Sequence, residues 1–243
     1  MSYLNTKPLL YGLQHGSMKD QIDLTLDYPS NLVKALKNNQ IDIGLLPVAA
    51  LADIDGYHIV SDHCIATEGE VASVCIFSEV PLEEIDTVFL DYQSRTSVML
   101  CKILFEKHWK KSVQYIDAND DSYIEKIKGN VAGLVIGDRA LSMRQRFNFI
   151  YDLGLGWKEM TGLPFVFAVW VTTSKLQPDV VEQFSNAFQL GIDQIPVIVH
   201  QNPFKDYDLL IYYTQNISYH LDSSQTIGLK TFLSYLEEKK QTS

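Results

Sequence analysis

The first residues of the chain join polar side chains to the start of a helix. Asn5 and Thr6 directly precede Lys7 and Pro8, and a proline is typical of the first turn of a helix. Two interpretations of these polar residues stay open. Either one of them caps the helix, or Asn5 turns its amide, which both donates and accepts hydrogen bonds, into a ligand site.

A second polar run, residues 91–97, lies between a predicted strand at 87–90 and a predicted helix. Backbone N–H groups at the start of a helix favour a carboxylate or a phosphate. Ser94, Thr96 and Ser97 add hydroxyl donors, and Arg95 offers two parallel hydrogen bonds to a carboxylate. The run therefore predicts an anion site, with plain capping of the helix as the alternative.

Two further candidates stand at the ends of predicted strands. Ser73 lies near the start of a predicted strand at 71–77, where it either faces a ligand or satisfies backbone groups. Asp138 follows a predicted strand at 131–136, and open α/β sheets place ligands at such strand ends. The alternative for Asp138 is a helix cap beside a solvated ion pair.

Motifs for metals and cofactors are missing from the sequence. The six histidines have no spacing typical of a metal site. There is no Gly-x-Ser-x-Gly motif and no glycine-rich nucleotide loop. We therefore expect no metal and no cofactor. Such a sequence suits a binding protein, or an enzyme whose substrate supplies most of the reactivity.

Strand-like and helix-like segments alternate along the chain. Short apolar or alternating runs predict strands at residues 22–26, 41–46, 71–77, 87–90, 113–116, 131–136 and 164–172. Helical patterns fill several of the intervals, and the chain from residue 178 onward is mostly helical. This order favours an α/β fold with a largely parallel sheet.

Two short breaks, near residues 78–84 and 173–177, divide the chain. We predict an outer α/β lobe made of residues 1–80 plus 174–243, and an inserted α/β lobe made of residues 81–173. The two crossings between the lobes would act as a hinge. A cleft at a lobe junction is a favoured ligand site.

Composition narrows the class of partner. The chain has 243 residues, with 20 Lys and Arg against 30 Asp and Glu, and this net charge of −10 disfavours nucleic acid. Its three cysteines lack metal or redox spacing. Neither a secretory leader nor an apolar run long enough to span a membrane is visible. We expect a cytoplasmic protein without nucleic-acid or membrane partners, and this composition still allows a small anionic ligand held locally by backbone N–H groups.

The sequence resembles the chorismate dehydratases, the first enzymes of the futalosine route to menaquinone. The resemblance lies in Ser-Tyr-Leu-Asn-Thr-Lys-Pro-Leu at 2–9, in residues 42–48, in residues 91–97, and in Trp157 with Thr-Gly-Leu-Pro-Phe-Val-Phe-Ala at 161–168. It covers most of the chain. It implies the two-lobed fold of class II periplasmic binding proteins, with a ligand cleft between the lobes.

The resemblance also implies an activity, the dehydration of chorismate to 3-[(1-carboxyvinyl)oxy]benzoate by a lyase without a cofactor. Asn5 and Ser73 match the asparagine and the serine of the family's cleft and are assigned catalytic roles. No base is evident, which favours proton removal by the substrate's own enolpyruvyl carboxylate, with Glu68 and Glu70 as alternative bases. The residues assigned to substrate binding are Ser94, Arg95, Thr96, Ser97, Asp138 and Thr161.

Two other functions stay open. Dihydroxynaphthoate synthase shares the pathway and the fold, and a histidine in the cleft would favour it. A solute-binding protein that does no chemistry also shares the fold. Members of the dehydratase family carry a short strand before the opening signature. A chain that starts at Met1 is therefore expected to lack most of that strand, at a cost in stability or activity.

Overall fold

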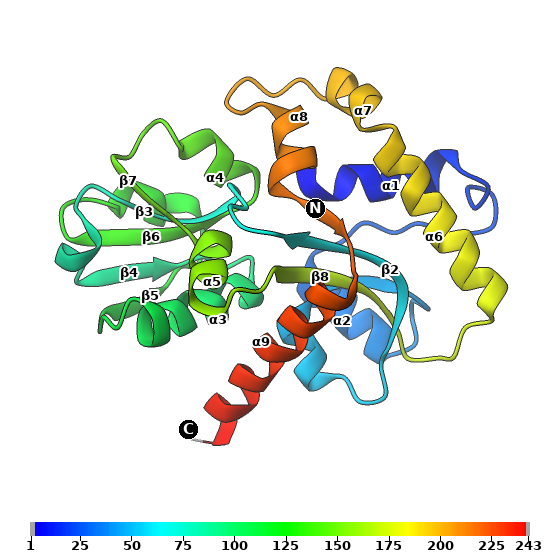
Figure 1. Ribbon diagram of the computed structural model, residues 1–243, viewed down its shortest axis with the longest axis horizontal. Helices are drawn as coiled ribbons and strands as arrows, with labels where there is room; N and C mark the ends of the chain where they lie inside the picture. Colours follow the sequence, from blue (N-terminus) through cyan, green and yellow to red (C-terminus); the bar gives the residue numbers. More distant parts are fainter. Residues whose placement is uncertain (1–2, 242–243) are drawn as a thin grey trace.

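The computed structural model describes residues 3–241 and contains two β-sheets, each in its own half of the molecule (Figure 1). We call the two halves the four-stranded lobe and the five-stranded lobe. The four-stranded sheet has the order β1, β8, β2, β9, which are Gly44–Pro47, Phe165–Thr172, His58–Thr67 and Ser218–His220. The five-stranded sheet has the order β5, β4, β6, β3, β7, which are Gln114–Asp117, Thr87–Leu90, Val131–Ile136, Val74–Ser78 and Phe149–Asp152.

The α/β class is confirmed, but the expected largely parallel sheet is wrong. In the four-stranded sheet, β8 runs antiparallel to both β1 and β2, and β9 runs antiparallel to β2. In the five-stranded sheet, β4 is parallel to β5 and β6, whereas β3 is antiparallel to β6 and β7. Parallel pairs occur where a helical crossover joins the strands. The other pairs join segments that are distant in the chain, and their direction follows from where the chain returns.

Two strands lie in a different sheet from the one that the sequence suggested. β3 was expected in the outer lobe but pairs in the five-stranded sheet, and β8 was expected in the inserted lobe but pairs in the four-stranded sheet. Within residues 3–241 the chain therefore changes sheets at residues 68–73 and at residues 162–164. The predicted breaks, near 78–84 and 173–177, are turns that follow a strand within one lobe. The exact residue limits of the lobes remain a prediction.

A carboxylate secures the first of these crossings. Asp152 precedes the helix α5 (Leu153–Thr161) and accepts hydrogen bonds from the N–H groups of Gly154 and Leu155 at 2.9 and 3.0 Å. It also accepts from the N–H groups of Val71 and Ala72 at 3.1 and 2.7 Å. Burial raises the pKa of Asp152, and these N–H groups oppose the rise. One side chain thus ties the crossing to the five-stranded lobe.

The strand expected at residues 22–26 is absent. These residues have no assigned strand, and β1 pairs within the described residues with β8 alone. Residues 21–27 and 40–45 instead line a common cavity. A strand needs a neighbour for its backbone groups, so alternating polarity without a partner strand does not form a strand here.

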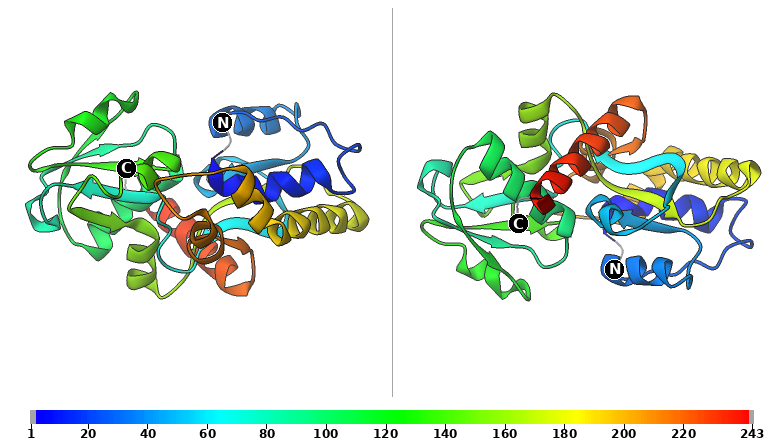
Figure 2. Two further views of the ribbon diagram at one scale, coloured as in Figure 1. Left: turned by 90° about the horizontal axis from the view of Figure 1, so that it is seen from above. Right: turned by 90° about the horizontal axis from the view of Figure 1, so that it is seen from below.

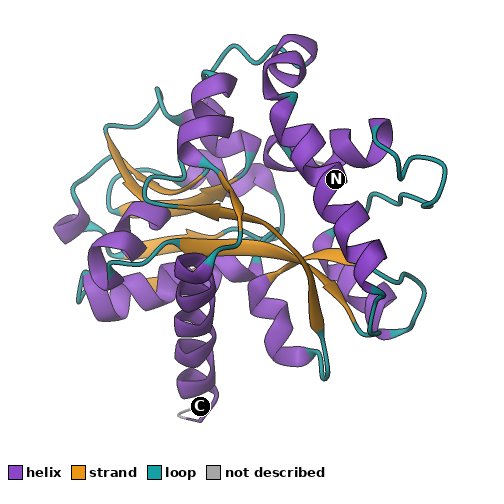
Figure 3. Ribbon diagram, turned by 45° about the vertical axis from the view of Figure 1, so that its right-hand side comes forward, coloured by secondary structure: helices purple, strands orange, loops and turns teal. Residues whose placement is uncertain are grey.

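Helices surround the strands of both sheets (Figure 3). In the four-stranded lobe, α1 (Lys7–His15) packs closely on α6 (Pro178–Asp193). A Cβ at Gly12 would lie 1.6 Å from the carbonyl oxygen of Ala187, and one at Gly191 would lie 1.8 Å from that of Pro8. Only glycine permits this approach, which fixes α1 and the polar residues before it. The lobe also holds α2, α7, α8 and a π-turn, at Pro29–Lys37, Ile195–Gln201, Leu209–Ile211 and Tyr212–Asn216.

The five-stranded lobe carries α3 (Arg95–Ile103), which continues as a π-turn, and α4 (Asp138–Met143), in addition to α5. The C-terminal helix α9 (Ser223–Gln241) lies at the junction of the two halves (Figure 2). Lys239 of α9 pairs with Glu106 of the five-stranded lobe at 2.6 Å. No helix within residues 3–241 is long and apolar enough to cross a membrane.

Candidate active site

A cavity of about 850 Å³ opens where the two lobes meet. Its lining includes residues 3, 5 and 6 before α1, residues 71, 73 and 74 at the first crossing, and residues 93, 94 and 97 before and within α3. The cavity also extends from the junction into the four-stranded lobe, where residues 21–27 line it. Four residues named from the sequence line it: Asn5, Ser73, Ser94 and Ser97.

Asn5 lies in a short 3-10 turn, Leu4–Thr6, that leads into α1. Its side-chain Oδ1 is buried and has no hydrogen-bond partner among the described residues. The side chain of Thr6, at the N-cap of α1, makes no capping hydrogen bond. Buried amide oxygens without partners are rare, because the lost hydrogen bond costs free energy. The Oδ1 of Asn5 is therefore left to accept a hydrogen bond from a ligand.

Ser73 lies at the end of the first crossing, where several short hydrogen bonds hold the backbone. Its N–H donates to the carbonyl of Val71 at 2.7 Å, and its carbonyl accepts from the N–H of Gly137 at 2.7 Å. The preceding Ala72 has a φ of +60°, a left-handed conformation that is costly for a residue other than glycine. The Ser73 Oγ accepts a hydrogen bond from the hydroxyl of Tyr212 at 2.8 Å.

Ser94 and Ser97 meet at the start of α3. Ser94 is the N-cap, and its Oγ accepts from the N–H of Ser97 at 3.1 Å, while the two hydroxyl oxygens lie 2.9 Å apart. Capping was the alternative interpretation of this run, and the structure shows it. Both serines also line the cavity, so capping does not remove them from the site.

Arg95 and Thr96 face elsewhere and do not line the cavity. The guanidinium of Arg95 forms a surface ion pair with Asp53 of the four-stranded lobe. Thr96 is buried, and its Oγ1 accepts from the N–H of Ala49 at 3.1 Å. Both side chains thus join α3 to the other lobe.

Asp138 and Thr161 do not line the cavity either. Asp138 Oδ1 accepts from the N–H of Leu4 at 3.0 Å and so holds the residue before Asn5. Burial raises the pKa of Asp138, and the hydrogen bond from Leu4 opposes the rise. Thr161 ends α5, where its hydroxyl donates to the carbonyl of Trp157 at 2.8 Å.

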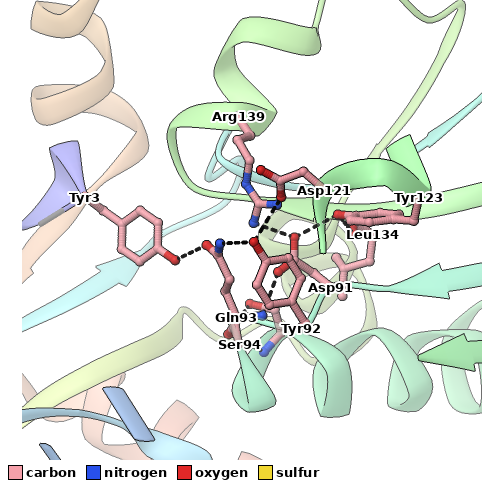
Figure 4. A network of polar contacts seen from close by, with 10 residues as sticks. Tyr3, Asp91, Tyr92, Gln93, Ser94, Asp121, Tyr123, Leu134 and Arg139 are labelled. Atoms are coloured by element: carbon pink, nitrogen blue, oxygen red, sulfur yellow. Dashed lines mark hydrogen bonds and ion pairs between the residues drawn. The ribbon is translucent and has the colours of Figure 1, made fainter. Parts of the chain in front are cut away.

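Tyr3 and Gln93 join the two lobes at the cavity, a contact that the sequence analysis did not identify. The Tyr3 hydroxyl donates to Oε1 of Gln93 at 2.5 Å, and both residues line the cavity (Figure 4). The ring of Tyr3 lies against Gly137, where a Cβ would stand 2.7 Å from ring carbons. Gly137 also has a φ of +65°. Close contact and backbone conformation both require glycine there.

A polar network behind Gln93 holds this loop in place (Figure 4). Gln93 Nε2 donates to the hydroxyl of Tyr92 at 2.8 Å. The guanidinium of Arg139 pairs with buried Asp91 at 2.7 Å, and the Tyr123 hydroxyl donates to Asp91 at 2.8 Å. Burial raises the pKa of Asp91, and Arg139 opposes the rise. Arg139 thus forms ion pairs with Asp91 and Asp121 and does not face the cavity.

The described lining of the cavity contains no lysine, arginine or histidine. The two alternative bases also lie outside the lining, since Glu70 pairs with Arg144 and Glu68 accepts from Gln225. Burial raises the pKa of Tyr3 to about 12, so its hydroxyl stays protonated. An anion at the lobe junction would therefore meet neutral N–H and O–H donors.

No group of three or more His, Cys, Asp or Glu side chains that could hold a metal ion occurs within residues 3–241. The three cysteines are free and buried, and burial raises the pKa of each thiol. Thiolate chemistry at these positions is therefore disfavoured.

Comparison with known proteins adds a family. A family model described as menaquinone biosynthesis matches residues 1–238. The chain is 27% identical over 227 residues to the chorismate dehydratase of Thermus thermophilus. The aligned region covers 84% of this chain and 83% of that protein. It is 30% identical over 137 residues to the chorismate dehydratase of Campylobacter jejuni. Here the aligned region covers 54% of this chain and 60% of that protein.

Solved structures agree on the fold. A protein from Archaeoglobus fulgidus superimposes with a TM-score of 0.73 at 15% identity, covering 98% of this chain and 95% of the other. The alkanesulfonate-binding protein of Xanthomonas axonopodis pv. citri superimposes with a TM-score of 0.66 at 10% identity, covering 98% and 91%. These likenesses confirm the expected two-lobed fold of solute-binding proteins.

Proposed function

The chain belongs to the menaquinone biosynthesis family, and we propose that it dehydrates chorismate to 3-[(1-carboxyvinyl)oxy]benzoate, the first step of the futalosine route. The observation that carries this proposal is the junction of the lobes, where the unpartnered amide of Asn5 and the hydroxyl of Ser73 line one cavity. The two chorismate dehydratases to which the chain is similar support the choice of substrate.

The reaction requires the protein mainly to orient the substrate and to exclude water. A ring C–H bond gives up its proton, the neighbouring C–O bond breaks, and the proton and the hydroxide leave as water while the ring becomes aromatic. We assign the proton to the enolpyruvyl carboxylate of the substrate, because no histidine or glutamate is among the described lining residues and the lining aspartates all belong to the four-stranded lobe. These aspartates are Asp23, Asp27, Asp42 and Asp179. Holding the carboxylate against the reacting C–H bond replaces a dedicated base.

We assign roles according to the donors present. The Nδ2 donor of Asn5 and the hydroxyl of Ser73 orient the enolpyruvyl arm, and the hydroxyls of Ser94 and Ser97 hold the ring carboxylate beside the first turn of α3. Neutral donors in a site closed to water stabilise developing charge more than they would in water. The lobes close about residues 68–73 and 162–164, which connect the two sheets.

We also place the protein in the cytoplasm, where its three free cysteines stay reduced. The sister activity, dihydroxynaphthoate synthase, would have been favoured by a histidine in the cleft. None is among the described residues that line the cavity.

The test is chromatography of chorismate after incubation with the purified protein, with and without a chelator. We expect the benzoate product in both cases. Asn5→Ala and Ser73→Ala should each lose roughly 100-fold in turnover, because a misplaced substrate reacts slowly. Asn130→Ala and Ser142→Ala, exposed positions outside the cavity, are the matched controls.

Three results would overturn the proposal. A folded protein that binds chorismate and returns it unchanged is a solute-binding protein. A protein that neither binds nor converts chorismate has another ligand. Turnover that stops on chelation would place a metal in the reaction.

A further inference from the structure

We propose that Tyr212 is a positioning residue that fixes the hydroxyl of Ser73 as a hydrogen-bond donor toward the cavity; this inference rests on the proposed function. The two residues are 139 positions apart in the chain, and their hydroxyl oxygens lie 2.8 Å apart. Tyr212 is 0% exposed and Ser73 is 1% exposed, so water does not compete for this contact. Ser73 lines the cavity, whereas Tyr212 does not.

In this hydrogen bond the hydroxyl of Tyr212 is the donor and the Oγ of Ser73 is the acceptor. Burial raises the pKa of the phenol well above its ordinary value, so Tyr212 carries its proton throughout the range in which proteins stay folded. It donates that proton to the Oγ of Ser73. A serine hydroxyl has one proton of its own and can accept two hydrogen bonds. With Tyr212 as donor, the proton of Ser73 remains free for another acceptor.

The cavity is where that acceptor would lie. No second partner of the Ser73 Oγ is seen among residues 3–241, and the side chain borders the cavity. A substrate with two carboxylates supplies the acceptor. Because no cation lines the described part of the cavity, each oriented neutral donor carries more of the binding.

The backbone around Tyr212 is built to hold this alignment. Tyr212 begins the π-turn Tyr212–Asn216, and the N–H of Ile217 closes the turn on the Tyr212 carbonyl at 3.0 Å. The amide of Asn216, at the end of the turn, donates to the carbonyl of Glu70 at 3.1 Å. The turn therefore contacts the first crossing at two residues, Glu70 and Ser73. Single π-helical turns of this kind are frequent at functional sites.

The neighbouring tyrosine provides a matched control. Tyr213 is also buried, its ring contacts that of Tyr212 with centroids 5.5 Å apart, and its hydroxyl has no hydrogen-bond partner within the described chain. Tyr212→Phe and Tyr213→Phe therefore remove the same atom from adjacent positions of one turn. Only the first removes a contact with Ser73.

In the activity test, we expect Tyr212→Phe to lower kcat for chorismate roughly 10- to 100-fold, because the hydroxyl of Ser73 is no longer held toward the reacting substrate. The KM should change less than about threefold, since Ser73 remains present. Tyr213→Phe should keep the wild-type kcat. In the Ser73→Ala background, Tyr212→Phe should change kcat less than about twofold, because residues that act as one unit are not additive. Equal losses from Tyr212→Phe in both backgrounds would show a general structural role and overturn the proposal.

A crystallographic readout does not depend on turnover. Ser73 should occupy one rotamer in the wild type and in Tyr213→Phe, and more than one in Tyr212→Phe. A single unchanged rotamer in all three proteins would overturn the positioning role even if the enzyme is active. A wild type that leaves chorismate unchanged would refute the proposed function, while the rotamers still decide what Tyr212 does.

Discussion

Replacing Asp152 with asparagine should loosen the crossing that ends at Ser73. The carboxylate Oδ1 accepts three N–H groups at 2.9–3.1 Å, and Oδ2 accepts the N–H of Ala72 at 2.7 Å. In Asp152→Asn the amide oxygen can keep the first set. The amide nitrogen then faces the N–H of Ala72, so that two donors meet. The thiol of Cys75, 3.6 Å from Oδ2, offers the amide only a weak acceptor.

The magnitude follows mainly from the contact with Ala72. A buried N–H group left without a partner costs about 1–3 kcal/mol. Ala72 already holds a left-handed conformation that costs roughly 1–2 kcal/mol, and the lost hydrogen bond is one of those that keep it there. We expect the free energy of unfolding to fall by about 1–3 kcal/mol, with a loss of turnover as Ser73 becomes less well placed.

Urea unfolding followed by tryptophan fluorescence measures this change. The matched control is Asp208→Asn, because Asp208 caps α8 by accepting two N–H groups and its side chain makes no hydrogen bond to residues 68–73. Asparagine and aspartate cap helices about equally well, so the control should lose no more than about 0.5 kcal/mol. Equal losses at Asp152 and Asp208 would refute the reasoning, since capping alone would then account for both.

Three other measurements test the assignment of the site. Arg95→Ala should leave the KM for chorismate within about twofold, because Arg95 forms an exposed ion pair with Asp53; a rise of about tenfold would return it to the site. Gly137→Ala should lower the free energy of unfolding by about 1–3 kcal/mol, because Gly137 has φ +65° and ψ −148°, and should displace the Tyr3 ring. Unchanged unfolding would contradict this. The kcat/KM should stay within about twofold between about pH 6 and pH 9, since no histidine is among the described lining residues and the pKa of Tyr3 is about 12. A rise or fall of kcat/KM with pH inside that range would reveal a titrating base.

The sequence by itself determined several local elements and indicated the family. Pro8 stands in the first turn of α1, Ser94 caps α3, and the strands expected at 87–90 and 131–136 have those limits in the structure. These features depend on a few neighbouring residues, so a local pattern suffices to predict them. The resemblance to the chorismate dehydratases was likewise visible in short motifs, and the match over residues 1–238 to the menaquinone biosynthesis family agrees with it.

Within the run at residues 94–97, the side chains could have been separated by capping and helical geometry. Ser94 is the N-cap and accepts from the N–H of Ser97, which brings the two serines together at the cavity. Arg95 and Thr96 are the first two residues of the helix, point to other sides of it and reach the other lobe. The residue types alone had grouped all four as hydrogen-bond donors to an anion.

Only the tertiary structure decided what depends on distant partners. The sheet to which β3 and β8 belong, and the missing pairing of residues 22–26, follow from which segment lies alongside. The contact of Tyr212 with Ser73 joins residues 139 apart, and no local pattern marks either one as the other's partner. Pairing of this kind is set by how whole elements pack, because one hydrogen bond is too weak to bring two remote segments together.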